Sequence, residues 1–188
     1  MTWVSAAVNA LGVVILYVLR PYVLDGVILR NRIRWLPELG LDFTLRLDGF
    51  AWFMLLLVFG IGLLVVIYAR YYLTTKDPVP RFFSYLLAFT GAMTGMLVSG
   101  NLIMLVVFWE LTSVFSFLLI GFWYHNATAR DGARMALIVT GGGGLCLLVG
   151  ALILGHIVGS YDLDWVLASG DLVRAHPLLL VVLVRPSS

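Results

Sequence analysis

The sequence predicts an all-α integral membrane protein with about five transmembrane helices and a short β-hairpin outside the membrane. The first observation is composition: 62% of the 188 residues are hydrophobic and 12% are charged, whereas charged residues make up about a quarter of an ordinary soluble domain. The second is that the apolar residues gather in long stretches of membrane-crossing length. The third is a segment of strict apolar and polar alternation before the second stretch, which indicates a strand.

Five apolar stretches are the predicted transmembrane helices. About 20 apolar residues in a helix cross a hydrocarbon core of about 30 Å. The first stretch lacks the basic start and the small-residue cleavage site of a signal peptide, so we interpret it as a spanning helix. In chain order the predicted helices are residues 2–19, 50–69, 82–98, 101–123 and 135–159.

The first link, residues 20–48, is predicted to be an extramembrane loop. Apolar and polar residues alternate strictly within it from Leu41 to Asp48, which is typical of a strand with one exposed face. Pro37 and Gly40 precede that strand and supply a turn. We therefore expect a β-hairpin near residues 33–48, on the membrane surface.

The later links are shorter. Residues 70–81 and 125–134 read as polar links, whereas Ser99-Gly100-Asn101 allows no more than a tight turn, so the helices on either side of it are antiparallel neighbours. Asn101 is a good N-cap for the fourth helix. Three acids after the fifth helix are interpreted as part of a solvated loop rather than as a metal site; they are Asp162, Asp164 and Asp171.

Glu110 is the candidate functional residue. It lies two residues from Thr112, the midpoint of the apolar run 101–123, and so about 3 Å along the helix axis from the centre of the bilayer. A charged side chain there costs roughly 2.5–3.5 kcal/mol on insertion scales. Such a carboxyl takes up and releases protons unless a cation holds it ionised, so we expect Glu110 to act in ion translocation. The alternative is a structural carboxyl that is hydrogen-bonded to a neighbouring helix.

Two further groups accompany Glu110. Ser113 falls within 60° of Glu110 on a helical wheel, and with Ser116 and Thr112 it is a candidate for a polar route. Packing between helices, with hydroxyls bonded to their own backbone, is the more common role of such residues. The run of Gly141, Gly142, Gly143 and Gly144 in the fifth helix predicts either close helix packing or a local helix break, with packing favoured.

The residues around Glu110 also carry a resemblance. The string FWELTSVFSFLLIGFW, from Phe108 to Trp123, resembles the glutamate-bearing helix of the antiporter-like membrane subunits shared by Mrp-type multisubunit cation/proton antiporters and respiratory complex I. The resemblance extends from Leu47-Asp48-Gly49-Phe50 to Tyr161. Ile138-Val139-Thr140 and the glycines after it look like the large A subunit of the Mrp antiporter. The resemblance implies that Glu110 is an essential carboxylate of a proton pathway.

The resemblance also implies that family features are missing. Relatives carry one more helix before the equivalent of the first, and a lysine on a later helix serves as the partner of the glutamate. Lys76 is the one lysine of this chain, and it lies in a predicted loop. We therefore interpret residues 1–188 as a single transmembrane domain truncated at both ends relative to the family, and we expect that it cannot perform antiport alone. The resemblance places the strand segment outside the cell, and the links 70–81 and 125–134 in the cytoplasm.

The functional hypothesis is a subunit of a cation/proton antiporter in the bacterial cell membrane, which couples proton movement to export of a monovalent cation, with Na⁺ expected, through Glu110. The expected partners are the lipid bilayer and other antiporter subunits, and no cofactor, metal or nucleic acid is expected. One alternative is a proton-pumping membrane subunit of a redox complex like complex I or a hydrogenase. Another is an inactive truncated fragment.

Overall fold

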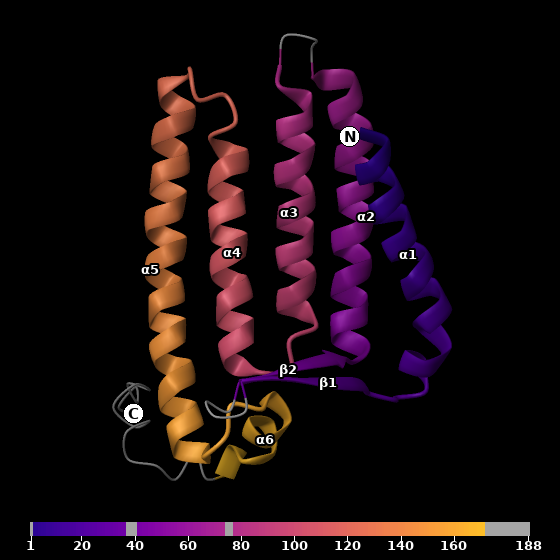
Figure 1. Cartoon of the computed structure of the whole chain (residues 1–188), viewed down its shortest axis with the longest axis vertical. Helices are drawn as coiled ribbons and strands as arrows, with labels where there is room; N and C mark the ends of the chain where they lie inside the picture. Colours follow the sequence, from indigo (N-terminus) through magenta and orange to yellow (C-terminus); the bar gives the residue numbers. More distant parts are fainter. Residues whose placement is uncertain (1, 37–40, 74–76, 172–188) are drawn as a thin grey trace, which may run out of the picture.

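Five long helices stand side by side in chain order and form a single row (Figure 1). The computed structural model describes residues 2–36, 41–73 and 77–171. Each helix packs mainly against the one before and the one after it along the chain, and α1 also touches α3. Because a row buries less surface than a bundle, most large apolar side chains remain on the outside, where lipid or other membrane segments solvate them.

The helices agree with the predicted spans, with ends that their capping residues explain. Asn101 caps α4 and accepts hydrogen bonds from the amides of Ile103 and Met104, at 2.9 and 3.4 Å. Asp48 caps α2 in the same way, accepting from the amide of Ala51 at 2.8 Å. The bounds are Thr2–Leu24 for α1, Gly49–Tyr72 for α2, Val79–Leu97 for α3, Leu102–Ile120 for α4 and Ala127–Val158 for α5.

Five predicted helix ends were off by three or more residues, and the largest differences are at the end of α1 and the start of α5. α1 continues five residues past the predicted end, through Pro21 to Leu24. α5 begins at Ala127 rather than at residue 135, because Asn126 accepts a hydrogen bond from the amide of Thr128 at 3.0 Å and caps the helix. Most of the predicted polar link 125–134 is therefore the first two turns of α5, which carry polar side chains because they extend beyond the apolar stretch.

Among the described residues, four helices are long and apolar enough to cross a membrane by length and composition: α1, α2, α4 and α5. α3 has 19 residues but is less apolar, because it carries Arg81 and several hydroxyl side chains. Its threonines satisfy their hydroxyls within the helix: Thr90 donates to the carbonyl of Leu86 at 3.0 Å, and Thr94 donates to that of Thr90 at 2.8 Å. With neighbours on both sides, α3 is the central helix of the row.

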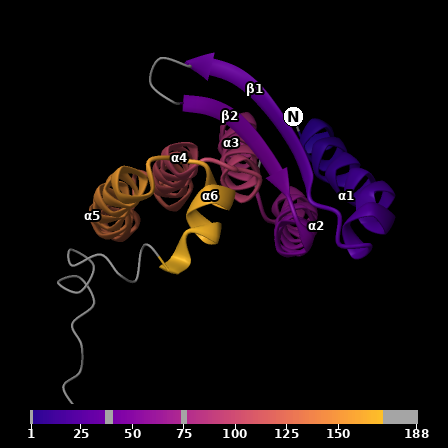
Figure 2. The ribbon, with the colours of Figure 1, turned by 90° about the horizontal axis from the view of Figure 1, so that it is seen from below.

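The predicted hairpin is present. Strand β1 (Leu29–Leu36) pairs antiparallel with β2 (Leu41–Leu47), with Ile33 opposite Phe43. The turn predicted at Pro37 and Gly40 lies outside the described residues. The hairpin crosses the ends of the helices, at the same end as the short helix α6 (Leu163–Ala168) (Figure 2).

The hairpin is tied to the turn between α3 and α4. Gly100 donates its amide to the carbonyl of Thr44 at 2.7 Å, and the amide of Arg46 binds the carbonyl of Val98 at 2.7 Å. The side chain of Arg46, 15% exposed, bonds Asp48 at 2.6 Å and Asp164 at 2.9 Å. Arg30 of β1 also pairs with Asp164, at 2.9 Å, so two arginines join the hairpin to α6. Asp162 and Asp164, predicted to be solvated, are instead a helix cap and the partner of Arg46.

A buried apolar core lies between α2 and α3. A cluster of four buried apolar residues lies there, and Phe83 is fully enclosed. The members of the cluster are Val66, Ala69, Phe83 and Leu86. With the five helices and the hairpin in place, the predicted fold class is confirmed.

Candidate functional site

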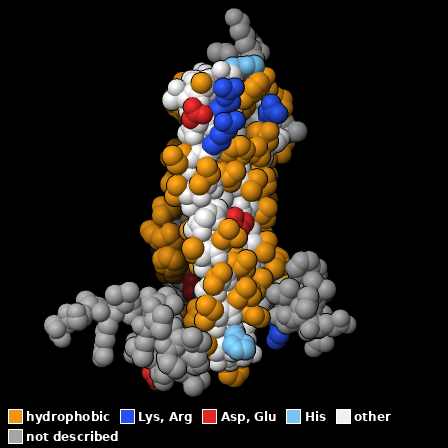
Figure 3. Space-filling model, turned by 90° about the vertical axis from the view of Figure 1, so that its left-hand side faces the viewer, with side chains coloured by type: hydrophobic (Ala, Val, Ile, Leu, Met, Phe, Trp, Pro, Cys, Tyr) orange, Lys and Arg blue, Asp and Glu red, His pale blue; other side chains and the backbone are white. Residues whose placement is uncertain are grey.

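Glu110 lies at the middle of α4. The helix runs from Leu102 to Ile120, so its midpoint is Leu111, and Glu110 is the adjacent residue. The shorter helix brings the carboxyl closer to the centre of the apolar region than the 23-residue run implied. A face of the molecule shows an acidic side chain at mid-height between hydrophobic and uncharged side chains, with basic side chains gathered toward the upper end (Figure 3).

The carboxyl of Glu110 lies in the contact between α4 and α5. A Cβ atom built on Gly144 of α5 would overlap Oε1 of Glu110 and would lie 2.7 Å from its Cδ. Gly144 itself is buried. Glycine at this position therefore lets the carboxyl lie directly against the backbone of the neighbouring helix.

Oε1 of Glu110 has no hydrogen-bond partner among the described residues, although the atom is buried. A buried polar atom without a partner costs about 1–3 kcal/mol, and more if it is charged. The backbone amides of α5 near Gly144 are bonded within their own helix, so they do not offset this cost. The arrangement can accommodate a proton, a water molecule or a cation at this oxygen.

The glycine run was predicted to allow either close packing or a helix break. α5 is continuous through all four glycines, so the structure shows no break. Gly144 is the glycine that meets α4, whereas a Cβ added at Gly141, Gly142 or Gly143 would have no described atom of another element within 4 Å. Close packing therefore applies at one position of the four.

Two of the three hydroxyl groups predicted for a polar route form hydrogen bonds with a backbone carbonyl of their own helix. Thr112 and Ser113 both donate to the carbonyl of Trp109, at 2.7 and 3.3 Å. Ser113 is buried and Ser116 is half-buried. A hydroxyl bonded to its own helix has its donor in use, so these residues offer a route mainly through the lone pairs of their oxygens.

A buried polar pair on α1 was missed by the sequence reasoning. Asn9 donates to the carbonyl of Ser5 at 2.8 Å, and both side chains are fully buried. The Asn9 Oδ1 and Ser5 Oγ atoms have no partner among the described residues. Gly62 of α2 gives them room, because a Cβ there would overlap Asn9 Oδ1. A signal was available, since Asn9 interrupts an apolar stretch at a spacing of four from Ser5, which puts both on one face.

Two further points concern Lys76 and metal binding. Lys76 lies outside the described residues. No group of three His, Cys, Asp or Glu side chains among the described residues is close enough to hold a metal ion.

The chain matches two protein-family models. Residues 35–83 match the N-terminal model of chain 5 of NADH-ubiquinone oxidoreductase (complex I). Residues 99–184 match the transmembrane model shared by NADH:quinone oxidoreductase and Mrp antiporters. The second match contains Glu110 and the whole of α5.

The chain is also similar in sequence to subunits of known cation/proton antiporters. The A/B subunit of a probable K⁺/H⁺ antiporter of Rhizobium meliloti is 59% identical over 98% of the chain, which covers 18% of that protein. The A subunit of a Na⁺/H⁺ antiporter of Alkalihalophilus pseudofirmus is 39% identical over 85% of the chain, covering 20% of that protein. The chain thus spans about a fifth of the length of these relatives.

Solved structures share the fold. The Mrp complex of Dietzia sp. contains a chain that matches 96% of this one with a TM-score of 0.78 and 26% identity, and 21% of that chain is covered. A chain of an archaeal membrane-bound sulfane sulfur reductase complex matches 85% of this chain with a TM-score of 0.66 and 18% identity, and 24% of that chain is covered. The second likeness concerns the fold alone.

Proposed function

Because the chain belongs to the family of membrane subunits that Mrp antiporters share with NADH:quinone oxidoreductase, we propose that it works as part of the large A subunit of a cation/proton antiporter, with Glu110 as its proton-binding carboxyl. The predicted family and the predicted location, as a multi-pass protein of the bacterial cell membrane, are confirmed. The activity, the transported cation and the partner subunits are proposals, since the chain corresponds to about a fifth of its relatives.

The observation that carries the proposal is the unpartnered carboxyl oxygen at the middle of α4, in the part of the chain that the structure describes. A proton on Oε1 removes the charge that the apolar surroundings disfavour. A positive charge that approaches from another segment would favour release of that proton. Glu110 would thus change its protonation as a charge partner approaches and withdraws, which is the coupling that antiport needs.

The direct test follows the carboxyl by difference infrared spectroscopy on the purified protein in lipid, as the pH is varied. We expect a protonated carboxyl band that titrates and that disappears in Glu110→Gln, and we expect the titration to shift when partner subunits are present. A carboxyl band that stays constant across the accessible pH range in both states contradicts the proposal and supports the structural role.

The cation needs a separate test. The sequence hypothesis expected Na⁺, whereas the relative with 59% identity is described as a probable K⁺/H⁺ antiporter and the one with 39% identity as a Na⁺/H⁺ antiporter. We propose a monovalent cation and keep both ions as candidates. Everted membrane vesicles that contain the assembled antiporter would lose a preformed pH gradient on addition of the transported ion, and Glu110→Gln would abolish that response. If neither ion dissipates the gradient, the proposed activity is wrong.

We further propose that residues 1–188 do not perform antiport by themselves, because Glu110 lacks a lysine partner in the apolar stretches of this sequence. Restoration of sodium or potassium tolerance to an antiporter-deficient strain by this chain alone would contradict that view. A redox-driven pump remains the second candidate, favoured by the complex I model that matches residues 35–83. Neighbouring genes for small antiporter subunits, or for iron–sulfur and flavin proteins, would distinguish the two.

A further inference from the structure

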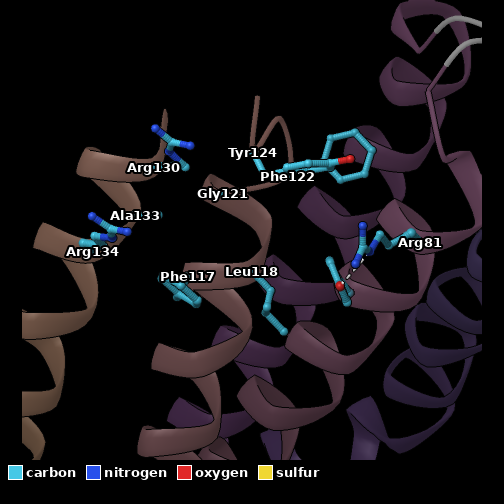
Figure 4. Close-up of a pocket in the computed structure, with 10 residues that line it drawn as sticks. Arg81, Phe117, Leu118, Gly121, Phe122, Tyr124, Arg130, Ala133 and Arg134 are labelled. Carbon is cyan, nitrogen blue, oxygen red and sulfur yellow. Dashed lines mark hydrogen bonds between the residues drawn. The ribbon is translucent and has the colours of Figure 1, made fainter. Parts of the chain in front are cut away.

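A cavity of about 290 Å³ lies between α3, α4 and α5, at the end of the helices away from the hairpin (Figure 4). Three arginines line it: Arg81 from the first turn of α3, and Arg130 and Arg134 from the first two turns of α5. We call these three residues the arginine pocket. The apolar part of the lining includes Phe117 and Leu118 near the end of α4, and Phe122 just after it.

The positive charge of the arginine pocket is poorly compensated. Arg81 donates from Nε to the hydroxyl of Tyr85 at 2.9 Å, a neutral partner. Neither Arg130 nor Arg134 forms an ion pair with an acid of the described residues. No described Asp or Glu lines the cavity, and Asp131, which lies between the two α5 arginines in sequence, is exposed. The three arginines are themselves exposed, so solvent screens their mutual repulsion, and a bound anion would neutralise part of their charge.

We propose that the arginine pocket binds the phosphate group of an anionic membrane lipid. The guanidinium group is planar and binds phosphate through two parallel N–H donors. The arginines lie where the apolar part of the helices ends, which is the level of lipid headgroups. The phenylalanine and leucine side chains below them suit the glycerol and the first acyl carbons. A lipid satisfies both parts of the lining, whereas free phosphate satisfies only the charged part.

The proposal does not depend on the role of Glu110, which lies about two turns deeper along α4 than Phe117. A proton site at mid-depth and a lipid site at the surface use different side chains. Failure of one proposal therefore leaves the other intact.

The test is native mass spectrometry of the full chain, purified and titrated with phosphatidylglycerol, and in parallel with phosphatidylcholine. We expect one retained phosphatidylglycerol per chain at concentrations where phosphatidylcholine is not retained. Each arginine near a membrane surface contributes about fivefold to binding of an anionic lipid, so Arg130→Gln with Arg134→Gln should weaken binding about 30-fold. The matched control is Arg70→Gln, since Arg70 lies at the same end of the molecule but stacks on Trp3 at 4.6 Å, outside the cavity.

A charge-conserving pair, Arg130→Lys with Arg134→Lys, separates lipid binding from folding. It should keep more of the preference for the anionic lipid than the Gln pair but less than the wild-type chain, because lysine retains the charge and loses the two parallel donors. Far-UV circular dichroism should show equal helix content in all variants. Equal retention of both lipids by the wild-type chain overturns the proposal, as does an equal loss in Arg70→Gln. If the chain retains inorganic phosphate and does not retain phosphatidylglycerol, the pocket binds free phosphate, and the proposal of a lipid site is overturned.

Discussion

The contact between Glu110 and Gly144 makes a sharp prediction about Gly144→Ala. The new Cβ would overlap Oε1 of Glu110 and lie 2.7 Å from Cδ and 3.3 Å from Cδ1 of Trp109. Carbon atoms in contact lie about 3.5–4.0 Å apart, so the carboxyl must withdraw by on the order of 1 Å. Overpacking of this kind costs about 1–3 kcal/mol.

The neighbouring glycine supplies the control. Gly143→Ala makes the same chemical change in the same helix, and no described atom of another element lies within 4 Å of its Cβ position. Both variants gain helix propensity, about 1 kcal/mol relative to glycine, and this gain cancels in their comparison. We therefore expect Gly144→Ala to have a free energy of unfolding about 1–3 kcal/mol lower than Gly143→Ala, measured by detergent-induced unfolding in mixed micelles.

A double-mutant cycle ties the effect to the carboxyl. Adding Glu110→Ala to Gly144→Ala removes the group that the new methyl meets, so the two substitutions should couple by about 0.5–3 kcal/mol. The same cycle with Gly143→Ala should show additivity. Equal stability of the two alanine variants, or additivity in both cycles, refutes the contact between the carboxyl and α5 on which the proposed proton site rests.

Three further predictions use the same unfolding assay. Gly62→Ala should have a free energy of unfolding about 1–3 kcal/mol lower than Gly60→Ala. The methyl group added at Gly62 meets the buried amide of Asn9, whereas one added at Gly60 meets no described atom. Equal free energies of unfolding would contradict the packing of α1 on α2. Asn101→Ala should cost about 1 kcal/mol through loss of the α4 cap, and Asn101→Asp should restore most of it. Arg46→Gln should cost about 1.5–3 kcal/mol, because Asp48 loses its charged partner and Asp164 keeps only the pair with Arg30. Limited proteolysis after α5 should become faster, and unchanged proteolysis argues against the tie between the hairpin and α6.

Features that depend on local sequence could be predicted. The apolar stretches placed all five long helices because hydrocarbon thickness fixes their length, and the alternation from Leu41 to Asp48 placed β2. Glu110 and the run of four glycines could both be singled out because each is costly or unusual in an apolar helix. Asn101 could be predicted as a cap because its residue type and position are specific to that role.

Features that depend on contacts distant in sequence could not be predicted. Nothing in the glycine run shows that Gly144, rather than Gly141, meets the carboxyl, because the rotation of α5 about its axis follows from packing along its whole length. Asp164 reads as a loop acid, and its partner Arg46 lies 118 residues away. The arginine pocket likewise combines residues of α3 and α5 that are neighbours only after α4 has packed between them.

The single row of helices explains why the carboxyl oxygen lacks a partner among the described residues. A helix in a row has one neighbour on each side, so a group at the middle of α4 meets α3, α5 or the outside. On the α3 side the ring of Phe108 packs on Gly95, and on the α5 side Gly144 presents backbone whose amides are already bonded within the helix. Glycine admits the carboxyl and supplies no donor. We propose that a proton binds Oε1, because the neutral carboxyl is less costly in apolar surroundings than the charged one.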